Sequence, residues 1–171
     1  DTAVAVHPDD DRYRHMIGRK AIVPMLDRDT VLMIREYAAG TERYELGLPK
    51  GRMEDGEDML EAANREIMEE IGYAARELEH LTSLTLAPGY LGHFTHVVLA
   101  RDLYEQQDEG DEPEPLEVVP WRMSELHTLL SRDDCTEARS IAALFMARDD
   151  ELDWSIVKLV EKRKHYSAQI A

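Results

Sequence analysis

The pattern of hydrophobic and polar positions changes along the chain between a period typical of strands and one typical of a helix. Short runs rich in β-branched and aromatic residues, bounded by Gly, Pro or Asp, predict strands. These runs are residues 20–26, 30–37, 42–48, 78–86, 94–101 and 116–121. The connection over 27–29 is short enough to join the first two runs as a hairpin. The segment 102–115 is acidic and contains Gly and Pro, which predicts a surface loop.

Helical periodicity is clearest over residues 58–71. Asp58, followed three residues later by Glu61, fits a capping box, and Gly72 stands where a left-handed residue ends a helix. One apolar stripe runs along this helix and predicts packing on a sheet. Its members are Leu60, Ala63, Ile67 and Ile71. Further helices are predicted over 124–130, 136–147 and 152–164. Mixed strands with helices on both sides predict an α/β fold, an α/β/α sandwich around a mixed β-sheet.

Composition narrows the classes of protein to which the chain can belong. Its 171 residues, 43% of them hydrophobic, can bury one proper core, so we expect a single domain over 1–171. The only cysteine, Cys135, excludes a disulfide framework and favours a cytoplasmic location. The first residues lack the basic start and apolar stretch of a signal peptide. A net charge of −16 argues against nucleic-acid and membrane partners.

A fixed spacing of polar residues surrounds the predicted helix. Residues 51–73 follow the pattern G-x5-E-x7-R-E-U-x-E-E-x-G-U, with U aliphatic, at every position but the last, which is Tyr73. The matching residues are Gly51, Glu57, Arg65, Glu66, Ile67, Glu69, Glu70 and Gly72. Residues three and four apart are neighbours on a helix surface, so the last three glutamates converge. Like charges that close together are unfavourable unless a cation lies between them.

Clustered carboxylates of this kind are hard oxygen ligands, which suit Mg2+ or Mn2+ and leave positions for the oxygens of a phosphate. A diphosphate is therefore the expected substrate, and a bound ion would neutralise it and acidify an attacking water. Arg35 and Lys50 lie in the segments that lead into the pattern and are candidates to bind phosphate. The competing interpretation, a solvated acidic helix face, is weakened by the Gly, Glu and Arg framework around the cluster.

The pattern over 51–73 is that of the Nudix box, and the chain resembles the Nudix hydrolases. Flanking segments at 34–51, 87–90, 101–104 and 109–116 are similar to the ADP compounds hydrolases of that family, relatives of the ADP-ribose pyrophosphatases. The likeness covers about residues 12–148. It implies a single Nudix domain that hydrolyses ADP-linked compounds such as ADP-ribose, NADH or diadenosine polyphosphates to AMP and a phosphorylated product.

The resemblance also implies roles for residues of the box. Glu57 and Arg65 would pair and hold the loop against the helix. Glu66, Glu69 and Glu70 would be catalytic carboxylates and metal ligands, and the carbonyl of Gly51 would add a further ligand.

Outside the box, the resemblance implies nucleoside contacts by Tyr37 and Glu45. The base for the attacking water would come from a glutamate on the acidic loop, and Glu112 and Glu114 both remain candidates. Related enzymes are homodimers with an extra antiparallel segment ahead of the domain, so residues 1–19 would be a partial form of that extension.

Three alternatives stay open from the sequence. The fold could bind nucleotides as a sensor without cleaving them, or an acidic surface could serve as an interaction module. A Nudix enzyme acting on nucleoside triphosphates or capped nucleic acid is the third. The complete set of acidic positions in the box favours an enzyme over a sensor.

Overall fold

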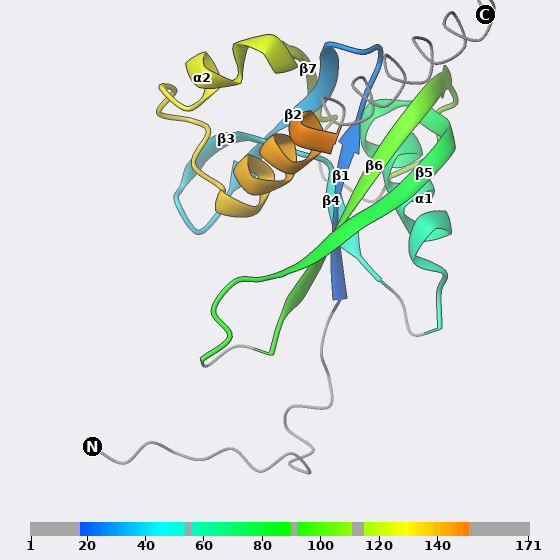
Figure 1. Cartoon of the computed structure of the whole chain (residues 1–171), viewed down its shortest axis with the longest axis horizontal. Helices are drawn as coiled ribbons and strands as arrows, with labels where there is room; N and C mark the ends of the chain where they lie inside the picture. Colours follow the sequence, from blue (N-terminus) through cyan, green and yellow to red (C-terminus); the bar gives the residue numbers. More distant parts are fainter. Residues whose placement is uncertain (1–17, 54–55, 90–91, 111–114, 151–171) are drawn as a thin grey trace, which may run out of the picture.

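The strands form two sheets that meet in one layer (Figure 1). The computed structural model describes residues 18–53, 56–89, 92–110 and 115–150. One sheet has the order β4-β1-β6-β5 and the other β3-β2-β7. The strands are β1 Gly18–Pro24, β2 Thr30–Ala38, β3 Arg43–Gly47, β4 Lys50–Arg52, β5 Tyr73–Thr85, β6 Phe94–Glu105 and β7 Glu117–Arg122. β1 runs parallel to β6, and the other pairs are antiparallel, so the first sheet is mixed as expected.

Helices cover both faces of the strands, which confirms the predicted α/β/α sandwich. Helix α1 (Met59–Ile71) packs on one face, and the helix over 138–150, orange in Figure 1, packs on the other. Strand side chains alternate between the two cores. Ile22 and Val98 pack with α1, whereas Val23 and Val97 pack with the second helix. A short 3-10 turn (Met123–Glu125) and α2 (Leu126–Leu129) follow β7.

The ends of α1 are set by the residues that the sequence indicated. The side chain of Asp58 accepts hydrogen bonds from the backbone N–H groups of Leu60 and Glu61 at 2.9 and 3.0 Å. Gly72 ends the helix with φ +75°, a left-handed conformation that costs a glycine little. Asn64 then accepts a hydrogen bond from the backbone of Ala75 in β5 at 2.8 Å. These contacts fix how the charged face of α1 meets the sheet.

Two local predictions are wrong. The first two strands touch through a single bridge, Met25 with Val31, and then separate into different sheets. The reason is that β4 and β6 already pair with both edges of β1. The loop predicted over 102–115 begins later, because β6 continues to Glu105. The polar end of β6 pairs with the start of β5, which begins directly after Gly72.

The helix expected over 152–164 and residues 1–17 of the expected extension 1–19 lie outside the described residues. Within the described ranges, no helix has the length and apolar character needed to cross a bilayer.

Candidate active site

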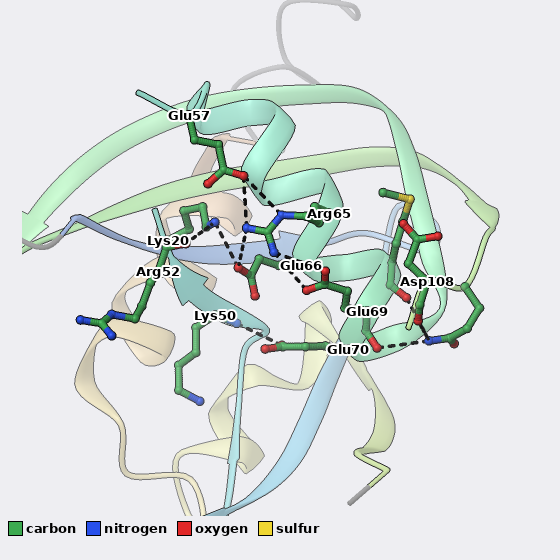
Figure 2. A network of polar contacts seen from close by, with 11 residues as sticks. Lys20, Lys50, Arg52, Glu57, Arg65, Glu66, Glu69, Glu70 and Asp108 are labelled. Carbon is green, nitrogen blue, oxygen red and sulfur yellow. Dashed lines mark hydrogen bonds and ion pairs between the residues drawn. The ribbon is translucent and has the colours of Figure 1, made fainter. Parts of the chain in front are cut away.

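The acidic face of α1 lies against β1 and β4 (Figure 2). The helix supplies Arg65 and the three glutamates of the box, and the loop before it supplies Glu57. From the sheet come Lys20 in β1 and Lys50 in β4. A helix face, an interior residue of β1 and the first residue of β4 therefore place these charged side chains in one region.

Arg65 ties the loop to the helix through its guanidinium group. Its Nη2 donates to Oε1 of Glu57 at 3.1 Å, and its Nη1 donates to Oε2 of Glu69 at 3.2 Å. The structure thus places Glu57 and Arg65 side by side, with Glu69 on the same arginine. Because guanidinium can bind several carboxylate oxygens at once, one residue orders both segments.

Glu66 is the most enclosed of the three glutamates, with 8% of its surface exposed. Its Oε1 accepts a hydrogen bond from Nζ of Lys20 at 3.2 Å. A Cβ at Gly51 would overlap the Glu66 carboxylate, so only glycine lets β4 come this near to α1. Burial raises the pKa of Glu66 above its ordinary value, and Lys20 offsets part of that rise.

Glu70 lies one turn further along the helix, where the backbone N–H of Lys50 donates to its Oε2 at 3.2 Å. Burial, together with the charge of Glu66, raises the pKa of Glu70 to about 8, although Lys50 acts in the opposite direction. Two partly desolvated carboxylates thus face the same region without enough positive charge to balance them. A cation between them would remove that imbalance.

The donor set fits a divalent ion with hard oxygen ligands, such as Mg2+ or Mn2+. Glu66 and Glu70 would hold the ion beside the bare backbone of Gly51, and Glu69 is adjacent. Among the residues that the structure describes, no three His, Cys, Asp or Glu side chains are already gathered around one point. Lys20 contacts Glu66, and Arg65 contacts Glu69.

The four predicted substrate residues fall in different places. Lys50 lies at the α1 site, where its Nζ donates to Glu36 at 2.6 Å. Arg35 forms ion pairs with Glu117 at 3.0 Å and Asp134 at 2.7 Å. Tyr37, half exposed, meets Tyr44 edge to face, with ring centroids 5.5 Å apart.

Glu45, the last of the four, accepts a hydrogen bond from Arg43 at 2.7 Å and another from Thr136 at 3.0 Å. Lys50 is therefore the member of this set that the described contacts bring to the glutamates of α1.

The candidate bases Glu112 and Glu114 lie outside the described residues. The segment before them is held on the last turn of α1. The backbone N–H of Asp108 donates to the carbonyl of Met68 at 3.3 Å, and the side chain of Gln107 donates to the same carbonyl at 3.1 Å. These bonds satisfy carbonyls that a helix end leaves without intrahelical partners.

Two charged residues at the site were not among the sequence candidates. Lys20 shares the strand face of Ile22, and Glu36 shares that of Leu32 and Ile34. A period-two reading could have found both, because it places each charge on the face that packs against α1.

Comparison with known proteins shows which family has this fold and sequence pattern. The profile described as NUDIX domain matches residues 16–145. ADP compounds hydrolase NudE of Escherichia coli K12 is 48% identical over 128 residues, which cover 75% of this chain and 68% of that protein. ADP-ribose pyrophosphatase of Bacillus subtilis 168 is 30% identical over 129 residues, 74% of this chain and 70% of that protein.

A solved structure agrees with the sequence comparison. The crystal structure of an ADP compounds hydrolase superposes with a TM-score of 0.74 at 47% identity, over 78% of this chain and 71% of that one. The fold and the site define a hydrolase that acts on pyrophosphate bonds. The chain belongs to the Nudix family, as its box predicted. Nudix hydrolases of this kind generally use a divalent metal ion.

Proposed function

We propose that the chain is a Mg2+- or Mn2+-dependent pyrophosphatase that hydrolyses small ADP-linked compounds. ADP-ribose, NADH and diadenosine polyphosphates are the expected substrates, and AMP and a phosphorylated remainder are the products. The observation that carries the proposal is the carboxylate of Glu66, buried against Gly51, with the half-buried carboxylate of Glu70 one helical turn away. The relatives named ADP compounds hydrolase and ADP-ribose pyrophosphatase support the ADP part of the substrate.

The residues of the chain divide the work of the reaction. Glu66, Glu70 and the carbonyl of Gly51 would hold the ion, with Glu69 available beside them. When bound, the ion supplies charge neutralisation for the diphosphate and a more acidic attacking water. Phosphoryl transfer depends mostly on positioning and charge stabilisation, so no covalent nucleophile is needed.

Other groups would orient the substrate and remove the proton. Lys50, whose side chain is 26% exposed, is near enough to the glutamates to meet a phosphate oxygen. Arg35, Tyr37 and Glu45 are proposed for the rest of the nucleotide. Glu112 or Glu114 would take the proton of the water. The anchoring of Gln107 and Asp108 on α1 supports a position for that loop beside the site.

The direct test is to incubate the protein with Mg2+ and ADP-ribose and to separate the products by chromatography. We expect AMP and ribose 5-phosphate in equal amounts. Glu70→Gln is expected to lose turnover by several orders of magnitude, because it removes a metal ligand. Glu61→Gln makes the same charge change on an exposed position of the same helix and is the matched control. Equal activity of Glu70→Gln and the control would contradict the proposal.

A substrate panel separates the remaining alternatives. Turnover of ADP-ribose, NADH or a diadenosine polyphosphate above that of nucleoside triphosphates and capped RNA supports the proposed class. Binding of ADP-ribose without AMP would instead indicate a sensor. Hydrolysis in 18O-labelled water then identifies the attacked phosphorus by the product that carries the label.

We also propose that the chain forms a single Nudix domain and associates as a homodimer, as the family likeness implies. Light scattering in solution tests the dimer: a mass of about twice the 19.6 kDa of the chain is expected. A mass equal to one chain would overturn that part of the proposal.

A further inference from the structure

Lys20 is a fully buried lysine in the middle of β1. Its side chain has 0% exposure, and Nζ donates to the carbonyl oxygen of Arg52 at 2.8 Å and to Oε1 of Glu66 at 3.2 Å (Figure 2). In the sheet, Lys20 stands opposite Gly51 of β4. Its ammonium group therefore bonds to one atom of β4 and one atom of α1.

Burying an ammonium group is costly, and a buried ion pair contributes little net stability compared with hydrophobic residues of similar volume. Lysine is almost never fully buried unless it is paired. The residues that follow Lys20 in β1 are apolar, with Ala21, Ile22 and Val23 all buried. A methionine at position 20 would fill the same space without the cost of a charge. The position of the charge, rather than core stability, accounts for this lysine.

The contacts of Lys20 join the two elements that form the metal site. The carbonyl of Arg52 belongs to β4, directly after Gly51, and Gly51 touches the carboxylate of Glu66. Lys20 and Arg65 both approach Glu66 through Oε1, at 3.2 and 3.5 Å. An ion can thus be coordinated by Oε2 while both of these contacts are kept.

We propose that Lys20 is a positioning residue of the metal site, which fixes the carboxylate of Glu66 and the backbone of β4 in the geometry that binds the divalent ion. This inference rests on the proposed metal-dependent activity. Partners that orient a metal ligand generally affect metal affinity or activity by about 10- to 100-fold when they are removed. Lys20 adds a residue outside the Nudix box to the set on which the site depends.

The test compares Lys20→Met with Arg19→Met. Both substitutions remove one positive charge from β1, but successive strand side chains point to opposite faces, so Arg19 points away from Glu66. Mn2+ affinity is measured without substrate by electron paramagnetic resonance, and Mg2+ affinity by calorimetry. We expect the dissociation constant of Lys20→Met to rise about tenfold or more, with that of Arg19→Met within twofold of the unaltered protein.

The same measurement on the unaltered protein separates the two proposals. An unaltered protein that binds no divalent ion and releases no AMP contradicts the proposed function. An unaltered protein that binds the ion, together with a Lys20→Met variant that binds it equally well or more tightly, contradicts only the role of Lys20.

A second comparison covers the case in which Lys20→Met folds poorly. If Lys20→Met loses stability because the Glu66 carboxylate is left without its partner, the double variant Lys20→Met with Glu66→Gln should melt at a higher temperature than Lys20→Met alone. Equal destabilisation by Lys20→Met in the presence and absence of the Glu66 charge would show that the lysine stem acts only in packing, and the proposal would be overturned.

Discussion

Two groups of charged side chains in this protein both combine acidic and basic residues. In one group the negative charge lacks enough positive charge around it, and in the other the negative charge is fully paired. On α1, Glu66 and Glu70 share a partly buried region, and the pKa of Glu70 rises to about 8. Across the molecule, Asp134 accepts two hydrogen bonds from Arg132 at 2.8 Å and one from Arg35 at 2.7 Å. These contacts, with Arg132 the strongest, lower the pKa of Asp134 to about 2.

The difference separates a carboxylate that needs a cation from a carboxylate whose charge the neighbouring arginines already balance. The arginines around Asp134 already stabilise its charge, so this carboxylate needs no cation. Around Glu70, burial and a neighbouring carboxylate make the charged form unfavourable, which is the condition that a divalent ion relieves. Carboxylates such as Glu70, whose pKa is raised by burial and by a neighbouring negative charge, are the ones that indicate a functional site.

The largest expected effect comes from the ligand group itself. Glu66→Gln should reduce turnover of ADP-ribose by several orders of magnitude, because the most enclosed carboxylate of the site loses its charge. Asp134→Asn should keep turnover within about tenfold while it lowers stability. Steady-state kinetics and thermal melts of both variants make the comparison. A large loss of turnover in Asp134→Asn would show that the second network also belongs to the active site.

A smaller effect is expected from the backbone that borders the acidic group. Gly51→Ala places a Cβ where the carboxylate of Glu66 lies, so the carboxylate or β4 must move. We expect a fall in kcat/KM of roughly 100-fold, at the upper end of effects from residues that orient a ligand. Gly40→Ala is the matched control, because no atom lies within 4 Å of a Cβ built there. Equal kinetics for the two alanine variants would mean that the close approach at Gly51 has no functional role.

The helix and its acidic face could be predicted because local rules define them. Asp58 and Gly72 set the ends of α1, and the spacing of its glutamates places them on one face whatever the rest of the chain does. The sequence placed β1, β2, β3 and β7 to within two residues, whereas β5 begins five residues before its predicted start and β4 was not predicted. The separation of β1 and β2 into different sheets was not predictable, because it depends on β4 and β6 taking both edges of β1.

Electrostatic balance at the site was equally beyond the sequence. Arg35 has a favourable position in the chain for binding phosphate, yet its guanidinium pairs with Asp134, 99 residues away. The burial of Lys20 and the raised pKa of Glu70 likewise depend on which elements pack together. Long-range contacts thus decide which of the similar charged residues have balanced partners.

The carboxylate of Glu70 should also destabilise the metal-free protein at high pH. The pKa of Glu70 rises from an ordinary 4.5 to about 8 on folding, so the folded state retains a proton that the unfolded state has lost. Stability from this group is full below pH 4.5 and is lost as the pH rises through 8. In the presence of a chelator at pH 8.5, Glu70→Gln should melt about 5 °C above the unaltered protein.

Two measurements check the origin of that difference. The melting temperatures of Glu70→Gln and the unaltered protein should converge below pH 4.5, where the side chain at position 70 is neutral in the folded and unfolded states of both proteins. Added Mg2+ should stabilise the unaltered protein at pH 8.5 and leave Glu70→Gln nearly unchanged. A variant that is less stable than the unaltered protein at every pH would contradict the imbalance assigned to Glu70.

The balanced network should behave in the opposite way, with the smallest change. The pKa of Asp134 falls from 3.8 to about 2 on folding, so its contribution is present above pH 3.8 and is lost as the pH falls through 2. Asp134→Asn should therefore cost about 1–2 kcal/mol of unfolding free energy at pH 7, and less as the pH approaches 2. Urea unfolding at several pH values measures this cost. Because the arginines already balance the charge of Asp134, added Mg2+ should not change the free-energy cost of Asp134→Asn. By contrast, added Mg2+ should remove the destabilisation caused by the charge of Glu70.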